Sequence, residues 1–201
     1  MPKQPAYTVT VLIPCRNEAG NIEAAVDRMP RLGTHTEILF IEGGSIDGTR
    51  EKIREVIGQY AGKRDVKLLV EIADKSNPRS SKGDAVRQGM AAATGDILMI
   101  LDGDLTVPPE DLGKFYAAIV AGQGDFISGT RMVSRRERGA MPYFNALANW
   151  CFGRIFSLLL GQRLTDTLCG TKVMFRKDGE RIMASRHEFG DFDPFGDFDL
   201  L

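Results

Sequence analysis

Short apolar strands and amphipathic helices alternate along the first two thirds of the chain. Strand-like runs, rich in β-branched and apolar residues, recur at Val9–Ile13, Glu37–Ile41, Val66–Ile72, Ile97–Leu101 and Phe126–Ser128. Helical spacing of apolar residues predicts helices between them, at Asn21–Met29, after Asp47 with the stripe Ile53, Val56, Ile57 and Tyr60, at Ala85–Ala93 and from Pro108 onward. Because strand and helix alternate, we predict an α/β fold with a mostly parallel central sheet and right-handed crossover helices.

Single residues predict where these segments end. Pro14 should stop the first strand, because proline cannot donate to a strand ladder. Asp47 should cap the helix that follows it, and Gly95 should close the helix before the fourth strand. A further helix is expected over 143–160 and a further strand over Lys172–Arg176. No repeat or linker divides the sequence, so we expect all 201 residues to form one domain.

The apolar run Ile97–Leu101 ends abruptly in Asp102-Gly103-Asp104. Residues two apart in an extended segment point the same way, so both carboxylates should lie together at the rim of the sheet. Neighbouring carboxylates repel each other unless a cation lies between them, and hard oxygen ligands suit Mg²⁺ or Mn²⁺. Gly103 leaves room for a ligand to approach the backbone. Asp102 and Asp104 are therefore candidate metal ligands, and the alternative is an ordinary turn after a strand.

Two other polar loops should reach the same edge of the sheet. Pro14–Glu18 follows the first strand, and Glu42–Thr49 follows the second. Ligands of open α/β sheets bind beyond the carboxyl ends of the strands, so we expect both loops and Asp102–Asp104 to converge on one site. The chain has no Gly-x-x-x-x-Gly-Lys-Ser/Thr sequence, and Gly43-Gly44 lacks the Gly-x-Gly-x-x-Gly spacing. The motifs therefore exclude a P-loop and a dinucleotide fingerprint.

Composition narrows the class of protein further. Hydrophobic residues make up 43% of the chain and charged residues 26%, with a net charge of −1. These values are typical of a globular domain and lack the positive charge that favours nucleic acid as a partner. Three cysteines in no metal-ligand spacing indicate a reducing compartment. The start has no signal-peptide pattern, and no segment reaches the ~20 apolar residues that span a bilayer. We expect a cytoplasmic protein whose chain continues beyond the helix-like Phe198–Leu201.

Seven short motifs resemble those of GT-A glycosyltransferases of family 2, in the branch of dolichol-phosphate mannose synthases and bacterial polyprenyl-phosphate sugar transferases. The motifs are Ile13–Glu18, Gly44–Thr49, Lys82–Gly89, Ala93–Asp96, Asp102–Asp104, Ser128–Arg131 and Asp166–Lys172. Each is loose alone, but all of them in this order are highly specific. The resemblance implies a GT-A fold and an inverting transfer of a hexose from a GDP- or UDP-sugar, with Mg²⁺ or Mn²⁺ bound.

The resemblance also implies roles for residues around the nucleotide-sugar donor. The nucleoside would be held by Pro14, Arg16, Glu18 and the Glu42–Ser45 loop, which includes Gly44. Lys82, Gly83 and Asp84 would border the donor site. Asp102, beside Gly103, would lie near the ribose and the metal ion, and Asp104 would ligate the metal and serve catalysis.

Two departures from the family pattern bear on the nucleobase. The chain has Glu42-Gly43-Gly44-Ser45 where Asp-Asp-Gly-Ser is usual, and it has Arg16 where an aromatic residue is common. A carboxylate that contacts the base is therefore missing or replaced by Glu42. Both uracil and guanine stay open as the base.

The acceptor is expected to be a polyprenyl phosphate. Arg131 opens a basic segment that includes Arg135, and arginine suits bidentate phosphate binding. Apolar residues of 143–160 spread over most of a helix circumference, which suits a helix that touches lipid at a membrane surface. A solvated loop and an ordinary core helix are the alternatives. For a hydroxyl acceptor, the resemblance implies a general base in the acid-rich segment 190–199, where Asp197 is the best match.

Two other functions fit parts of the pattern. A sugar-phosphate nucleotidyltransferase also places acids at strand ends, but it would normally carry a Gly-rich loop after the first strand, and Pro14–Glu18 contains no glycine. A non-catalytic nucleotide-sugar-binding module is the third hypothesis, because Gly43 replaces a usual acid.

Overall fold

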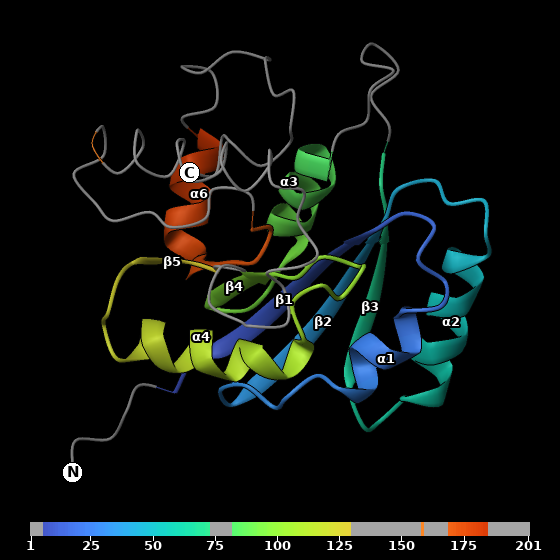
Figure 1. Ribbon diagram of the computed structural model, residues 1–201, viewed down its shortest axis with the longest axis horizontal. Coiled ribbons are helices and arrows are strands. Elements are labelled where there is room, and N and C mark those ends of the chain that lie inside the picture. Colours follow the sequence, from blue (N-terminus) through green and yellow to red (C-terminus); the bar gives the residue numbers. More distant parts are fainter. Residues whose placement is uncertain (1–5, 73–81, 130–157, 159–168, 185–201) are drawn as a thin grey trace, which may run out of the picture.

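A six-stranded sheet in the order β3-β2-β1-β4-β6-β5 forms the centre of the molecule (Figure 1). The computed structural model describes residues 6–72, 82–129, 158 and 169–184. The strands are β1 (Thr8–Cys15), β2 (His35–Glu42), β3 (Asp65–Val70), β4 (Ile97–Ile100), β5 (Phe126–Ser128) and β6 (Lys172–Phe175). β3, β2, β1 and β4 pair in parallel, whereas β6 is antiparallel to both β4 and β5. The predicted α/β class with a mostly parallel sheet is confirmed.

Helices cover both faces of the sheet (Figure 1). The described helices are α1 (Ile22–Asp27), α2 (Thr49–Gln59), α3 (Lys82–Ala92), the 3₁₀ turn η1 (Pro109–Asp111), α4 (Leu112–Val120) and α6 (Arg176–Ala184). α1, α2 and α4 pack on one face, and α3 and α6 pack on the other. No helix in the described part of the chain has the length and apolarity needed to cross a bilayer.

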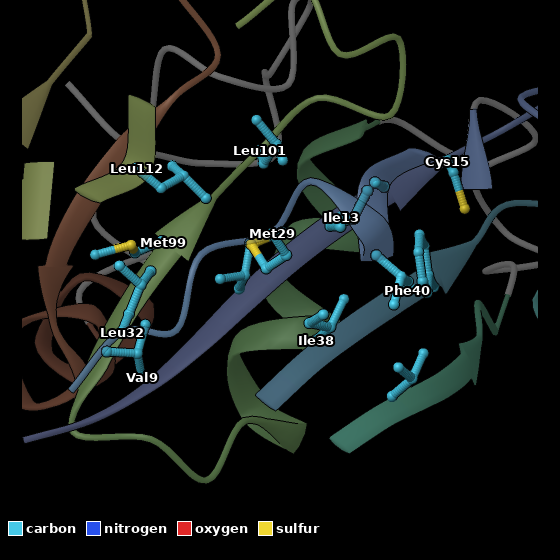
Figure 2. Packing of buried hydrophobic residues seen from close by; sticks show 14 of the residues in the cluster. Val9, Ile13, Cys15, Met29, Leu32, Ile38, Phe40, Met99, Leu101 and Leu112 are labelled. Atoms are coloured by element: carbon cyan, nitrogen blue, oxygen red, sulfur yellow. The ribbon is translucent and has the colours of Figure 1, made fainter. Parts of the chain in front are cut away.

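The central strand β1 is buried on both faces. Val11 and Ile13 join the larger apolar cluster with Phe40, which Figure 2 shows from close by. Leu12, one residue away, joins the second cluster under α3 with Ile41. Because both faces are covered, the strand is a continuous apolar run and does not alternate with polar residues.

Pro14 lies inside β1, so the prediction that it stops the strand is wrong. It pairs in register with Ile41 of β2. Leu12 accepts a hydrogen bond on the β4 side, from the amide of Leu101, and Cys15 accepts one on the β2 side, from the amide that follows β2. Neighbouring residues of a strand face opposite sides, so the missing N–H of Pro14 faces the β4 side. β4 has already ended there, and no ladder bond is lost.

Gly95 does not close α3 as a helix cap. The helix ends at Ala92, and Gly95 is absent from the glycines with a left-handed φ in the described residues. The amide of Gly95 donates to Thr10 Oγ1 over 2.9 Å, and a Cβ at Gly95 would lie 2.5 Å from the Thr10 amide nitrogen. Glycine is needed because the chain passes directly against β1.

Glu37 is a buried carboxylate that ties three strands and one loop together. Its side chain is 1% exposed. It accepts hydrogen bonds from Thr10 Oγ1 on β1 and from the Thr94 amide before β4, and Lys67 Nζ on β3 lies 2.5 Å from Oε1. Burial by itself would raise the pKa of Glu37, but the hydrogen bonds from Lys67, Thr10 and Thr94 outweigh it and hold the pKa below its ordinary value.

Removing this carboxylate should destabilise the fold. Glu37→Ala leaves the Thr10 hydroxyl and the Thr94 amide without their acceptor, and each buried polar group left unpaired costs about 1–3 kcal/mol. We expect a loss of about 2–4 kcal/mol in the free energy of unfolding, measured by urea denaturation. The control is Glu110→Ala, which removes an exposed ion pair with Arg28 and should cost under about 1 kcal/mol. Equal denaturation midpoints for Glu37→Ala and the wild type would contradict this assignment.

The same carboxylate predicts a pH dependence of stability. Because the folded-state pKa lies below the ordinary value of 4.5, the ionised group stabilises the fold above about pH 4.5, and this contribution is lost as pH falls through the lower folded-state pKa. Glu37→Gln keeps an acceptor oxygen but has no charge to lose. The difference in melting temperature between wild type and Glu37→Gln should therefore shrink as pH falls from 7 towards 3. A difference that stays constant over that range would show that Glu37 does not titrate as proposed.

Candidate active site

The carboxyl ends of β1, β2 and β4 lie side by side because the three strands pair in parallel (Figure 1). Pro14–Glu18, Glu42–Thr49 and the residues from Asp102 onward leave the sheet at this edge, as the sequence predicts. The N-terminus of α3 reaches the same edge and brings Lys82 to Asp102. One edge therefore carries most of the polar residues that the sequence marks as candidates.

Side-chain hydrogen bonds join the first two loops into one unit. The Asn17 amide donates to Ser45 Oγ over 3.0 Å, and the Ile46 amide donates to Asn17 Oδ1 over 2.9 Å. Asn17 adopts a left-handed conformation with φ of 59°, which is uncommon outside glycine and favoured by asparagine. The loop after β1 is thus held by the loop after β2.

Asp47 and Thr49 make the second connection between these loops. Asp47 Oδ2 accepts a hydrogen bond from the Ala19 amide over 3.1 Å, and Thr49 Oγ1 accepts one from the Glu18 amide over 2.9 Å. Asp47 Oδ1 also accepts from the Thr49 amide, the first residue of α2. The capping position itself is Gly48, at φ 88°, so Asp47 satisfies the helix end from one residue further back than predicted.

Glu42 is an internal support of the second loop. Its side chain has no exposed surface; Oε2 lies 2.6 Å from Arg50 Nη2, and Oε1 accepts from the Ser45 amide. Burial by itself would raise the pKa of Glu42, but the Ser45 amide and the Arg50 guanidinium outweigh it and keep the pKa below the ordinary value. The expectation that Glu42 replaces a carboxylate in contact with the base is wrong, because these contacts hold both oxygens inside the protein.

Asp102 and Asp104 lie in a turn and not in an extended strand. The Leu105 amide donates to the Asp102 carbonyl over 3.0 Å, and Leu105 has a left-handed φ of 54°. The argument from strand alternation is therefore wrong for this pair, although both residues follow β4 directly. Asp104 is exposed, and its Oδ1 accepts from the Thr106 amide over 2.9 Å.

Asp102 is tightly surrounded. Its Oδ1 lies 2.6 Å from Lys82 Nζ, and about a third of each side chain is exposed. A Cβ at Gly170, just before β6, would collide with the Asp102 carboxylate. Gly103 packs equally closely, since a Cβ there would lie 3.0 Å from the Pro14 carbonyl oxygen. Gly103 therefore fits the turn against β1, which corrects the expectation that it leaves space for a ligand.

A cavity of about 230 Å³ opens between these elements. Its lining comes from the ends of β1 and β2, the residue after β3 and the start of α3. The lining residues are Pro14, Cys15, Arg16, Ile41, Gly43, Glu71, Lys82 and Ala85. The floor is largely apolar, and the charged groups are two cations and one carboxylate. This composition suits a planar organic group joined to an anionic one.

The Cys15 thiol in this lining is not a nucleophile. Cys15 is 4% exposed, and its Sγ donates to the Ile41 carbonyl over 3.6 Å; Figure 2 shows it at the end of β1. Burial, reinforced by the nearby carboxylate of Glu42, raises the pKa of the thiol to about 12. A thiol with this pKa stays protonated at neutral pH, so the residue serves packing.

The remaining candidate residues divide into three groups. Glu18 and Asp84 make local contacts, with Asn21 Nδ2 at 2.7 Å and Arg87 Nη2 at 2.5 Å. Gly44 and Ser45 form the loop after β2, where Gly44 has a left-handed φ of 73°. Arg131, Arg135 and Asp197 lie outside the described residues, as does most of the helix expected over 143–160.

Sequence reasoning missed two residues at this edge. Glu71 lines the cavity, and Gly170 lies against Asp102. The position of Glu71 at the end of a predicted strand was a usable signal, because β2 was expected to carry a polar loop at its own end. Gly170 belongs to a recognised motif, but its contact with Asp102 depends on the antiparallel entry of β6 beside β4.

Comparisons with known proteins agree with this architecture. The sequence model of glycosyl transferase family 2 matches residues 10–182. A dolichol-phosphate mannosyltransferase of Pyrococcus furiosus is 31% identical over 141 residues, which are 69% of this chain and 37% of that protein. The chain thus spans little more than a third of this relative.

The fold is also similar to solved structures. Two are of glucosyl-3-phosphoglycerate synthase from Mycobacterium tuberculosis, one with uridine diphosphate and one with Mn²⁺, uridine diphosphate and glucosyl-3-phosphoglycerate. Their TM-scores are 0.63 and 0.62 at 23% and 21% identity, and each match covers 85% of this chain and 57% of the other. The α/β sheet described above is thus the fold of GT-A glycosyltransferases, and the chain belongs to glycosyltransferase family 2.

Proposed function

We propose that this protein transfers a hexose, with inversion, from a nucleoside-diphosphate sugar to a polyprenyl phosphate. The observation that carries the proposal is the convergence of the strand ends, the start of α3 and the Asp102–Leu105 turn around one cavity of about 230 Å³. Family membership supports sugar transfer over nucleotidyl transfer, because the matched family is one of glycosyltransferases.

The charges around the cavity suit the diphosphate of such a donor. Arg16 and Lys82 line it, and Lys82 Nζ lies 2.6 Å from Asp102 Oδ1. Arginine and lysine both bind phosphate oxygens, arginine through a planar fork and lysine as a point charge. In this proposal the apolar part of the lining holds the nucleoside, and the two cations orient the diphosphate towards Asp102.

Asp104 and Asp102 are the residues that would hold Mg²⁺ or Mn²⁺. The exposed carboxylate of Asp104 offers the hard oxygen ligands that these ions prefer. No group of three or more metal-binding side chains occurs among the described residues, which fits an ion held by one or two carboxylates together with substrate oxygens and water. When bound, the ion offsets the negative charge that develops on the departing diphosphate.

The proposed acceptor places different demands on the protein. A phosphate acceptor is already ionised, so it needs positioning cations more than a general base. We assign this role to Arg131 and Arg135, and we assign contact with a membrane surface to the apolar residues of 143–160. A basic segment next to an apolar helix suits the headgroup and chain of a lipid phosphate. The relative from Pyrococcus furiosus, a dolichol-phosphate mannosyltransferase, supports this class of acceptor.

Removing the exposed carboxylate should abolish catalysis. Asp104→Ala is expected to lower the Mn²⁺-dependent release of nucleoside diphosphate from a nucleotide-sugar by at least about 100-fold, because the leaving group loses its stabilising charge. Asp125→Ala, an exposed aspartate just before β5 at the opposite edge, is the matched control and should stay active. An active Asp104→Ala variant would refute the metal role, and a wild type without turnover that binds the donor would favour the non-catalytic module.

The acceptor is tested separately. The wild type should transfer labelled hexose to a polyprenyl phosphate in liposomes, and a polyprenyl alcohol should accept none. The double variant Arg131→Ala/Arg135→Ala should raise the KM for the lipid by about 10-fold or more, since charged hydrogen bonds to phosphate are lost. Its rate of donor hydrolysis without acceptor should stay unchanged. Transfer to a soluble phosphorylated acceptor, together with no flotation of the protein with liposomes, would replace the lipid by a small-molecule acceptor.

A further inference from the structure

We propose that Glu71 is the residue that recognises the nucleobase of the donor, and that the base it selects is guanine. The inference rests on the proposed function, since it assigns the nucleoside of a nucleotide-sugar to the cavity of about 230 Å³. It names a specificity-determining residue outside the motifs that carry the family resemblance.

The backbone of Glu71 is fixed by the sheet. β3 ends at Val70, but the amide of Glu71 still donates to the Glu42 carbonyl over 2.9 Å and continues the pairing with β2 by one bond. The residue is half-buried and lines the cavity together with Pro14 and Arg16. A side chain on a fixed strand end can present its carboxylate with little loss of entropy on binding.

The Glu71 carboxylate occupies the space over Gly43. A Cβ at Gly43 would lie 2.9 Å from Glu71 Oε2, closer than such atoms approach in proteins. Position 43 is where the usual family pattern has the second aspartate, so the absence of a side chain there makes room for a carboxylate from the neighbouring strand. The adjacent acid, Glu42, cannot serve, because it is buried and bound to Arg50.

A carboxylate distinguishes the nucleobases by their N–H donors. Guanine presents N1–H and the N2 amino group side by side, and the two oxygens of one carboxylate can accept both. Uracil presents a single N3–H between two carbonyl oxygens, which a second carboxylate oxygen would repel. Adenine and cytosine each place one amino group beside an unprotonated ring nitrogen, with the same mismatch. Glu71 therefore fits the guanine edge and disfavours the other three bases.

The lining strengthens this selection. Ile41, Ala85 and Pro14 offer apolar contacts that any base could use, so they do not discriminate. A hydrogen-bonding group in such surroundings rejects ligands that leave it unpaired, and this rejection exceeds what apolar contacts achieve. The selectivity of the cavity is thus concentrated in one side chain.

The test measures the dissociation constants of GDP, UDP and ADP by calorimetry with Mg²⁺, on the 201-residue chain. The wild type should bind GDP at least about 10-fold more tightly than UDP or ADP. Glu71→Gln, which keeps the shape but replaces one acceptor oxygen by a donor, should weaken GDP about 10- to 100-fold and UDP less than about 3-fold. The control Glu55→Gln makes the same change at an exposed position on α2, outside the cavity lining, and should leave all three constants unchanged.

An exchange of the two positions gives a second, independent readout. Glu71→Ala should lose GDP affinity, and Glu71→Ala combined with Gly43→Asp should regain part of it by returning a carboxylate to the same space. Gly43 is not among the described residues with a left-handed φ, so aspartate is compatible with the backbone there.

The outcomes separate the inference from the proposed function. If nucleoside diphosphates bind but Glu71→Gln weakens all of them equally or none, or if the wild type prefers UDP, the role of Glu71 is refuted and the proposed function stands. If the exchange restores no GDP affinity, the two positions do not present a carboxylate to the same ligand edge. If no nucleoside diphosphate binds to the folded wild type, the proposed function and the inference both fail.

Discussion

The backbone ladder between β1 and its two parallel neighbours is the constraint on which the candidate site depends. β2 pairs with β1 over eight positions in register, and β4 pairs over four, so all three strands end at one edge. The ladder continues just past the strands, through the Leu101 amide on one side of β1 and the Gly43 amide on the other. These last bonds set where each loop leaves the sheet, and Pro14 fits because its missing N–H faces the side on which β4 has ended.

Acidic side chains at this edge have clearly different physical roles. Glu42 is fully buried and stabilises a loop through Arg50 and the Ser45 amide. Asp102 is partly buried against Lys82 and the backbone of Gly170. Asp104 is exposed and is engaged at one oxygen by its own turn. Burial decides the role, because a carboxylate whose oxygens are satisfied inside the protein has none left for a ligand.

The loops are well suited to hold a ligand because they brace one another. Asn17, Ser45, Asp47 and Thr49 connect the loop after β1 to the loop after β2 through side chains and amides. Such connections order backbone that would otherwise lose entropy when a ligand binds. The same reasoning applies to Glu71, whose backbone is an extension of β3 and whose side chain is excluded from other positions by the sheet beside it.

The sequence alone determined the α/β class, the order of the strands and helices up to β5, the convergence of three polar loops and, through its motifs, the family. These features depend on local periodicity and on the rule that parallel strands end together, and both can be read along the chain. It did not reveal that Pro14 stays within β1, that Gly95 and Gly103 are required for close packing, or that Asp102 and Asp104 lie in a turn. Tertiary structure alone decided these points, as well as the burial of Glu42 and the placement of Glu71 over Gly43. Each depends on which atoms of a distant strand come within contact distance, and no spacing along the sequence encodes that.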